Sequence, residues 1–268
     1  MGVTNYWVHA IDPIAIAIGP LPIRWYGLMY LLGFGIAYWL LVYRQKHGLL
    51  NLPSTSAVQD MLFYSFCGVL IGGRLGHCFF YDPRFYLTHP AEILMVWKGG
   101  MSSHGGFAGV MVALWLFARR RHTSFWHLLD NAALAVTPGL GLGRVANFIN
   151  AELVGKPATV AWAVIFPQVD NVPRHPVQLY QALTEGLLLF LILLWVGRRP
   201  TPPGRICGLF GMLYASVRIF TERYRASSNL LAGPAGLGLT QGQFLSLFAL
   251  AIGAGAFIYS FRRRGSTC

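Results

Sequence analysis

The stretch VQLYQALTEGLLLFLILLWVG, residues 177–197, decides the class of fold. A helix rises about 1.5 Å per residue, so about 20 apolar residues cross the roughly 30 Å hydrocarbon core of a bilayer. This run contains one residue that is charged at neutral pH, Glu185, about eight residues from its start. The stretch therefore predicts a transmembrane helix that carries a carboxyl group near the middle of the membrane.

Similar apolar runs recur along the whole chain. Of its 268 residues, 55% are hydrophobic and 11% are charged, and the mean hydropathy is +0.51; an average soluble domain has about 25% charged residues. We predict an all-α polytopic membrane protein in which residues 1–268 form a single integral membrane domain. Seven transmembrane helices are expected, over residues 24–43, 58–80, 100–118, 126–145, 177–197, 205–222 and 241–261.

Basic residues between these spans predict the orientation. They cluster in alternate loops, as Arg44 and Lys46, Arg119 to Arg121, Arg198, Arg199 and Arg205, and Arg262 to Arg264. Because Lys and Arg are enriched in cytoplasmic loops, we predict the N-terminus outside and the C-terminus in the cytoplasm. No removable signal peptide is expected. The net charge of +12 is then explained by basic residues that orient the spans in the membrane. We therefore predict no nucleic-acid partner.

With that orientation, seven ionisable residues inside the spans lie toward the outer half of the membrane. These residues are Arg24, Arg74, His104, Arg144, Glu185, Arg218 and Glu222. An ionised group in hydrocarbon is costly, so such residues normally face the bundle interior and mark a site. The pattern predicts one shared cavity, although Arg24 and Arg74 also fit arginines that extend from helix ends to the interface.

Two segments carry further polar groups. In YASVRIFTERYR, residues 214–225, the side chains of Tyr214, Arg218, Glu222 and Arg225 fall on one helix face; the alternative is a closed Arg218 to Glu222 pair. In GLGRVANFINAELVG, residues 141–155, an arginine, two asparagines and a glutamate fall within nine residues.

His104 stands among glycines in GGMSSHGGFAG, residues 99–109. We expect it to be buried, where neighbouring glycines give no packing benefit, and its side chain suits a proton acceptor near neutral pH. We therefore predict a site role, against the alternative of a satisfied core histidine. By contrast, Gly68, Gly72 and Gly76 recur every fourth residue and predict close packing of two helices.

The sequence lacks the usual motifs of hydrolysis. It has no HExxH, no metal-ligand spacing and no GxSxG. We predict no metal and no cofactor. Arginines with a histidine, tyrosines and asparagines suit the binding of a phosphate and the movement of a proton beside it.

The chain resembles the prolipoprotein diacylglyceryl transferases of bacterial plasma membranes. Seven ordered blocks carry the resemblance: RWYGLMY (24–30), GGRLGHCFFYDP (72–83), WKGGMSSHGG (97–106), GLGRVANFINAELVGKP (141–157), WAVIFP (162–167), RHPVQLYQALTEG (174–186) and YASVRIFTERYR (214–225). The fourth block resembles the family signature G-R-x-x-N-F-I-N-x-E-x-x-G.

The resemblance implies transfer of the sn-1,2-diacylglyceryl group of phosphatidylglycerol to the lipobox cysteine thiol of a prolipoprotein signal peptide, with release of glycerol 1-phosphate. It implies a multi-pass protein of the bacterial inner membrane with its site toward the outer leaflet. The catalytic residues it indicates are Tyr26, His104, Arg144 and Arg218. The substrate-binding residues it indicates are Asn147, Asn150, Glu152, Gly155, Glu185, Tyr214 and Glu222.

The general base is His104 or one of the glutamates. The segment ATVAWAVIFP, residues 158–167, is expected to form a short strand in an extracytoplasmic arm of about residues 146–176, and to gate or receive the protein substrate. The alternatives to a transferase are a lipid or anion transporter that uses the interior arginines, and a receptor or scaffold with seven spans.

Overall fold

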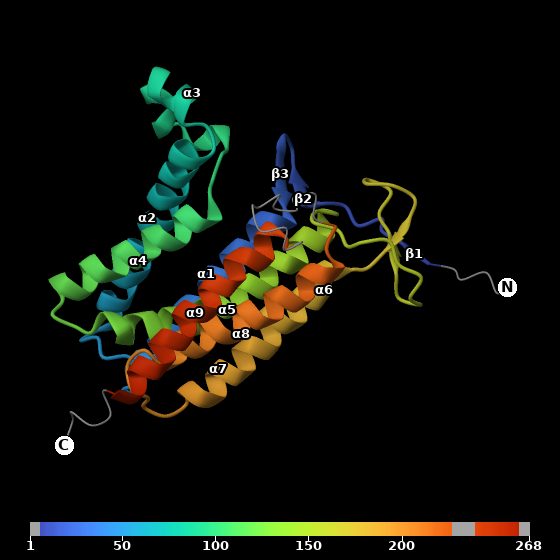
Figure 1. Cartoon of the computed structure of the whole chain (residues 1–268). Helices are drawn as coiled ribbons and strands as arrows, with labels where there is room; N and C mark the ends of the chain where they lie inside the picture. The colour runs from blue at the N-terminus through green and yellow to red at the C-terminus, as the bar shows by residue number, and fades with distance from the viewer. Residues whose placement is uncertain (1–5, 227–238, 263–268) are drawn as a thin grey trace. The chain divides into compact units, whose positions relative to one another are not determined.

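The computed structural model describes residues 6–226 and 239–262 (Figure 1). The chain forms two compact units, one of Met1–Leu40 with Ala132–Cys268 and one of Leu41–Asn131, and each is described by itself. Arg263 and Arg264, which belong to the last predicted cytoplasmic cluster, lie outside the described residues.

The unit of Leu41–Asn131 is built on two helices, α2 (Thr55–Phe80) and α4 (Ser103–Arg120). Between them the chain forms α3 (Pro83–Thr88) and the short 3-10 helices η1 (Pro90–Leu94) and η2 (Val96–Lys98). The predicted close packing is confirmed: a Cβ added to Gly72 would lie 2.3 Å from the Gly105 carbonyl oxygen, and one added to Gly68 would lie 2.6 Å from that of Gly109. The glycines let the two helix backbones touch.

The other unit, Met1–Leu40 with Ala132–Cys268, contains the remaining helices. Two of them, α1 and α5, also extend into the Leu41–Asn131 unit. The helices are α1 (Trp25–Lys46), α5 (Phe125–Ile149), α6 (Val177–Gln181), the π-helix η3 (Ala182–Leu188), α7 (Leu189–Gly197), α8 (Arg205–Thr221), the 3-10 helix η4 (Glu222–Tyr224) and α9 (Gln241–Arg262). Glycines again allow close approach, since a Cβ added to Gly186 would lie 2.4 Å from the Gly141 Cα atom.

Helices occupy all seven predicted ranges, and the chain is a mainly helical, multi-pass membrane protein. Five helices among the described residues are long and apolar enough to span a bilayer: Trp25–Lys46, Thr55–Phe80, Phe125–Ile149, Val177–Gly197 and Gly242–Arg262. The helices α4 and α8 fall outside this group because α8 has only 17 residues and α4 includes His104, Arg119 and Arg120 in its 18. The count of seven spans stays a prediction.

Two small sheets accompany the helices among the described residues. A three-stranded sheet has the order β1 (Trp7–Val8), β4 (Val164–Ile165), β5 (Pro173–Arg174), with β1 parallel and β5 antiparallel to β4. The strand predicted within residues 158–167 is therefore confirmed as β4. We call residues 6–9 and 150–176, which form this sheet and its connections, the arm.

A cluster of buried apolar residues holds the arm to the end of α5. Its members are Phe148, Ala151, Val154, Val164 and Phe166. Phe148 and Phe166 pack edge to face at 5.8 Å between ring centroids, and the His9 ring packs against both. The cluster positions the chain that leaves α5 after Ile149.

A separate hairpin of β2 (Ile14–Ile18) and β3 (Leu21–Arg24) precedes α1. Arg24 is the last residue of β3, and the helix begins at Trp25. The prediction that Arg24 opens the first span is wrong, because its backbone pairs with Ile14 in the hairpin.

Candidate active site

The site centres on Glu185, whose side chain is fully buried. Arg144, from α5, places Nε at 3.2 Å and Nη2 at 3.1 Å from Glu185 Oε2. Arg218, from α8, places Nη1 at 3.6 Å from Oε1 of the same carboxylate. One buried carboxylate thus joins two arginines from two other helices.

A second carboxylate, Glu222, extends this cluster. Its Oε2 atom lies 3.1 Å from Arg218 Nη2 and 3.5 Å from Arg225 Nη1. The Arg218 to Glu222 pair therefore forms, but it is not closed, because each partner also meets another charge. We call Arg144, Glu185, Arg218, Glu222 and Arg225 the ionic cluster. Its three arginines and two glutamates leave one positive charge in excess.

One donor of the ionic cluster has no acceptor in the part of the chain that the structure describes. Arg218 Nη1 is buried, and no described residue accepts a hydrogen bond from it, since 3.6 Å to Glu185 is too long. Leaving a buried donor unsatisfied is costly. Excess positive charge and an unused guanidinium donor together favour binding of an anion.

The surrounding side chains hold Glu185 in place. The Thr221 hydroxyl donates to Glu185 Oε1 at 3.3 Å, and Gln181 Nε2 lies 3.5 Å from the Thr221 hydroxyl oxygen. Tyr214 interacts with the Arg144 guanidinium. Glu185 also lies in the π-helix η3. This form of helix is rare in proteins, and where it occurs it is often at a functional site.

A second group of polar residues surrounds Glu152, just beyond α5. Asn147 Nδ2 and Asn150 Nδ2 donate to its carboxylate at 3.0 and 3.3 Å, and Gln178 Nε2 donates to its carbonyl at 2.7 Å. Its neighbours Ala151 and Leu153 have φ of 54° and 53°, which residues with a side chain rarely adopt. Such strain persists only where the surroundings fix it, so Glu152 is held in a defined position.

Tyr30 connects the two groups. It interacts electrostatically with both Arg144 and Glu152, and it hydrogen bonds with Tyr26, whose ring centroid is 5.2 Å away. Tyr26, one turn earlier in α1, thus reaches the site through Tyr30.

Gly155 fits a place where no side chain has room. A Cβ at this residue would lie 2.2 Å from the His175 carbonyl oxygen, and its backbone pairs with Arg225. The adjacent hydrogen bonds run from Lys156 N to Tyr224 O at 2.7 Å and from Ala226 N to Val154 O at 3.1 Å. Gly155 therefore joins the arm to the chain that follows Glu222.

His104 differs from its prediction. It is the second residue of α4 and is exposed, so the expectation that it is buried is wrong. The glycines beside it do serve packing, because Gly105 and Gly109 contact Gly72 and Gly68. No described residue hydrogen bonds to the His104 ring. It belongs to the Leu41–Asn131 unit, whereas the ionic cluster belongs to the other.

Arg74 has a structural role. It is buried and donates to main-chain carbonyls, from Nε to Ile93 at 3.0 Å and from Nη1 to Gly100 at 3.2 Å, with further bonds to Glu92 and Gly99. The guanidinium carbon of Arg74 also lies 5.2 Å from the centroid of the Tyr86 ring. Arg74 therefore fastens the loop that leads into α4.

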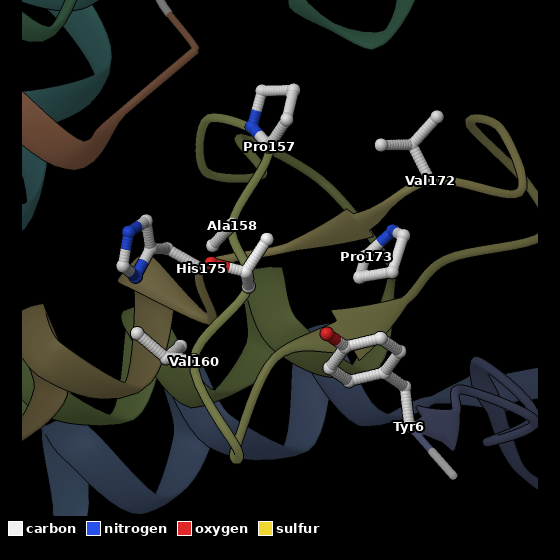
Figure 2. Close-up of a pocket in the computed structure, with 8 residues that line it drawn as sticks. Tyr6, Pro157, Ala158, Val160, Val172, Pro173 and His175 are labelled. Carbon is white, nitrogen blue, oxygen red and sulfur yellow. The ribbon is translucent and has the colours of Figure 1, made fainter. Parts of the chain in front are cut away.

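The arm contains a pocket of about 620 Å³ (Figure 2). It is lined by Tyr6, Pro157, Ala158, Thr159, Val160, Val172, Pro173 and His175. His175 Nδ1 lies 3.2 Å from the Tyr180 hydroxyl, which also accepts a hydrogen bond from Trp162 Nε1 at 2.6 Å. Burial lowers the pKa of His175, so the ring is neutral at neutral pH.

Several residues of the site were not predicted from the sequence. Tyr30, Gln178, Gln181 and Thr221 all contact or support the predicted residues. All four stood inside the quoted blocks, yet nothing in a single sequence separates them from their neighbours. Among the described residues, no three His, Cys, Asp or Glu side chains gather closely enough to hold a metal ion.

A helical membrane protein with an interior ionic cluster belongs to the class that carries a functional site within the bilayer, and the excess of arginines over carboxylates suits an anionic ligand. Residues 13–259 match the family model described as prolipoprotein diacylglyceryl transferase. The chain belongs to that family.

Curated relatives agree with this assignment. Several relatives carry the name phosphatidylglycerol--prolipoprotein diacylglyceryl transferase. The one from Nitrosospira multiformis is 48% identical to this chain, over 94% of this chain and 87% of the relative. The relative from Cupriavidus metallidurans is also 48% identical, over 94% of each chain, and that from Janthinobacterium is 45% identical over 96% of this chain and 99% of its own. None of these names supports the transporter alternative.

Proposed function

We propose that this protein transfers the sn-1,2-diacylglyceryl group of phosphatidylglycerol to the lipobox cysteine thiol of a prolipoprotein, with release of glycerol 1-phosphate. The observation that carries the proposal is the ionic cluster, which has one positive charge in excess and a buried Arg218 Nη1 that finds no acceptor within residues 6–226 and 239–262. A lipid phosphate supplies both the negative charge and the acceptor. The family assignment supplies the reaction.

The arginines act on the leaving group. The substrate sulfur forms a bond to the glyceryl carbon next to the phosphate, and the carbon to oxygen bond of that ester breaks, so the electron pair stays on the phosphate oxygen. Arg144 and Arg218 stabilise the growing negative charge there. Since Glu185 and Glu222 already hold both guanidinium groups in place, little reorganisation is needed during the reaction.

The thiol must lose its proton for the sulfur to attack, because the thiolate is the nucleophile. His104 accepts this proton or passes it on, and its exposed ring leaves its nitrogens accessible. The alternative base is a glutamate. Glu152 is the stronger candidate of these, since its two amide donors do not neutralise it, whereas Glu185 and Glu222 face arginines.

The other residues of the site bind and orient. Tyr26, Asn147, Asn150 and Tyr214 present hydrogen-bonding groups to the glycerol hydroxyls and the phosphate, and Gly155 keeps the arm close to Arg225. The pocket of the arm receives apolar residues that precede the lipobox cysteine, because prolines, valines and Ala158 line it. This role of the arm fails if deletion of residues 158–167 leaves peptide transfer unchanged.

The membrane arrangement is part of the proposal. Seven spans place the N-terminus outside and the C-terminus in the cytoplasm of a bacterial inner membrane, as the basic loops indicate. The ionic cluster then lies toward the outer leaflet, where the signal peptide of an exported protein holds its cysteine. The arm lies outside the membrane.

The test is the mass of a lipobox-containing signal peptide after incubation with the purified protein in phosphatidylglycerol liposomes. Wild type should add one diacylglyceryl group to the cysteine, and Arg144→Ala should reduce the rate by at least about 100-fold, a typical loss for a charge-stabilising donor. Arg121→Ala is the matched control, because Arg121 pairs with Asp60 on the surface. An unmodified peptide with active-facing wild type excludes the transferase.

A further inference from the structure

Outside the site, the guanidinium group of Arg205 has buried nitrogen atoms that find no hydrogen-bond acceptor among the described residues. This residue begins α8, and its guanidinium carbon lies 4.7 Å from the centroid of the Phe261 ring, in α9. Its Nε and Nη2 atoms are buried, and no described residue accepts a hydrogen bond from either. A buried donor without an acceptor is costly, so an acceptor from outside the described chain is expected.

The charge around Arg205 is positive. At this end of the bundle α7 ends, α8 begins and α9 ends (Figure 1). Arg198, Arg199 and Arg262 flank these ends, and the sequence has no Asp or Glu in residues 186–221 or 223–268. No ion pair to Arg205 forms among the described residues. An anion would supply both the hydrogen-bond acceptor and the negative charge that this region lacks.

Its position indicates the kind of anion. Phe261 and Trp195 are 50% and 64% exposed, and Arg198 stacks on Trp195 at 5.2 Å. Aromatic and basic side chains at the end of transmembrane helices are typical of the headgroup level of a bilayer. The forked donors of arginine match the oxygens of a phosphate. Basic pockets between transmembrane helices on the cytoplasmic side, where the basic loops place this end of the bundle, bind anionic headgroups.

This location is remote from the ionic cluster. Arg205 and Arg218 lie at opposite ends of α8, which separates them by roughly 20 Å at 1.5 Å of rise per residue. A lipid at Arg205 is thus not the reacting lipid.

We propose that Arg205, with Phe261 beside it and the neighbouring arginines around it, binds the phosphate of an anionic phospholipid in the leaflet opposite the ionic cluster. The headgroup phosphate accepts hydrogen bonds from the Arg205 guanidinium, and Arg198, Arg199 and Arg262 contribute charge. This lipid site does not depend on the proposed reaction.

The test is native mass spectrometry of the purified protein in micelles, titrated separately with dioleoyl phosphatidic acid and dioleoyl phosphatidylcholine. Arg205→Gln removes the anchoring donors, and Arg199→Gln removes the same charge from an exposed residue of the same cluster. Phosphatidic acid that binds at the ionic cluster is common to both variants, so their difference isolates the Arg205 site. The melting temperature of each variant and its peptide transfer confirm that it is folded.

We expect Arg205→Gln to bind phosphatidic acid about tenfold more weakly than wild type, because a hydrogen bond to a charged group is lost. Arg199→Gln should change the affinity by less than about threefold, as an exposed charge does, and phosphatidylcholine should bind more weakly than phosphatidic acid to wild type. Equal losses in both variants would show general charge attraction and overturn the proposal. Equal binding of the two lipids would also overturn the proposal. Displacement of phosphatidic acid by millimolar inorganic phosphate would overturn it too, because the ligand would then be free phosphate.

If Arg205→Gln does not fold, Phe261→Leu tests the same site. Loss of the stacked ring should weaken phosphatidic acid binding relative to Phe244→Leu, whose ring also packs on a neighbouring ring of α9 but lies near the opposite end of that helix. Unchanged binding in Phe261→Leu would contradict the proposal.

Discussion

Arg144 and Glu185, 41 residues apart in the chain, form an ion pair in which two guanidinium nitrogens face one carboxylate oxygen, at 3.2 and 3.1 Å. The carboxylate is fully buried, whereas the arginine side chain keeps 18% of its surface exposed. The pair therefore holds the arginine from its buried side, while the arginine side chain stays partly accessible.

Removing the buried charge should destabilise the protein. Glu185→Gln keeps the size of the side chain but leaves Arg144 and Arg218 without their shared counterion, so we expect a loss of about 3 kcal/mol or more in the free energy of unfolding. The matched control is Asp60→Asn, which breaks the exposed pair with Arg121 and should cost less than about 1 kcal/mol. Denaturant unfolding in mild detergent measures both, and equal effects would contradict the importance of burial.

Adding one methyl group at Gly155 should disrupt the arm. The Cβ of Gly155→Ala would lie 2.2 Å from the His175 carbonyl oxygen, so the backbone must move and the link to Arg225 must weaken. We expect a loss of about 1 to 3 kcal/mol, as for overpacking of a core, with a loss of peptide transfer. Gly35→Ala is the control, because nothing lies within 4 Å of its added Cβ. Normal activity of Gly155→Ala would refute this assignment.

The arm should become less stable in acid because of His9. The His9 side chain is buried, and this burial lowers its pKa. A pKa below the unfolded value of about 6.5 means that the folded arm is favoured above that pH and loses stability as the pH falls below it.

Hydrogen exchange of residues 158–176 at pH 7.5 and 5.5 measures this effect. We expect faster exchange at the lower pH in wild type and a smaller change in His9→Gln. Asp170 does not confound the comparison, because Arg174 lowers the pKa of its carboxyl below an already acidic value. His175, whose pKa is also lowered by burial, contributes in the same direction, so His9→Gln should reduce the change without abolishing it.

Placing a second carboxylate beside Glu152 should impair the reaction. Asn147→Asp replaces the 3.0 Å hydrogen bond by repulsion between two like charges at a mostly buried position. We expect a loss of at least about tenfold in the transfer rate, and a smaller loss for Asn150→Asp, whose bond to Glu152 is longer at 3.3 Å. The initial rate of peptide modification tests the order, and the reverse order would contradict the geometry.

Much of the fold could be predicted from the sequence because the signal is local. Each of the seven apolar ranges forms a helix, since hydrophobicity and helix formation depend on residues near one another in the chain. The spacing of Tyr214, Arg218, Glu222 and Arg225 likewise gives one helix face, and α8 with η4 brings Glu222 to both arginines.

The site was only partly predictable. Arg144, Glu185 and Arg218 were expected in one cavity because charges in an apolar segment must find partners, and the structure brings them together. The burial of His104 was wrongly predicted, because exposure depends on which helix faces which. The role of Arg74 also depends on a loop about 20 residues away, whose carbonyl groups its side chain binds.

By itself, the sequence determined a mainly helical membrane protein, a family and a set of interior charges, because composition and periodicity are properties of contiguous residues. Only the tertiary structure decided that Glu185 is shared by two arginines, that a π-helix holds it, and that Gly155 has no room for a side chain. Those features depend on contacts between segments distant in the chain, and no local pattern specifies the distance between two such segments.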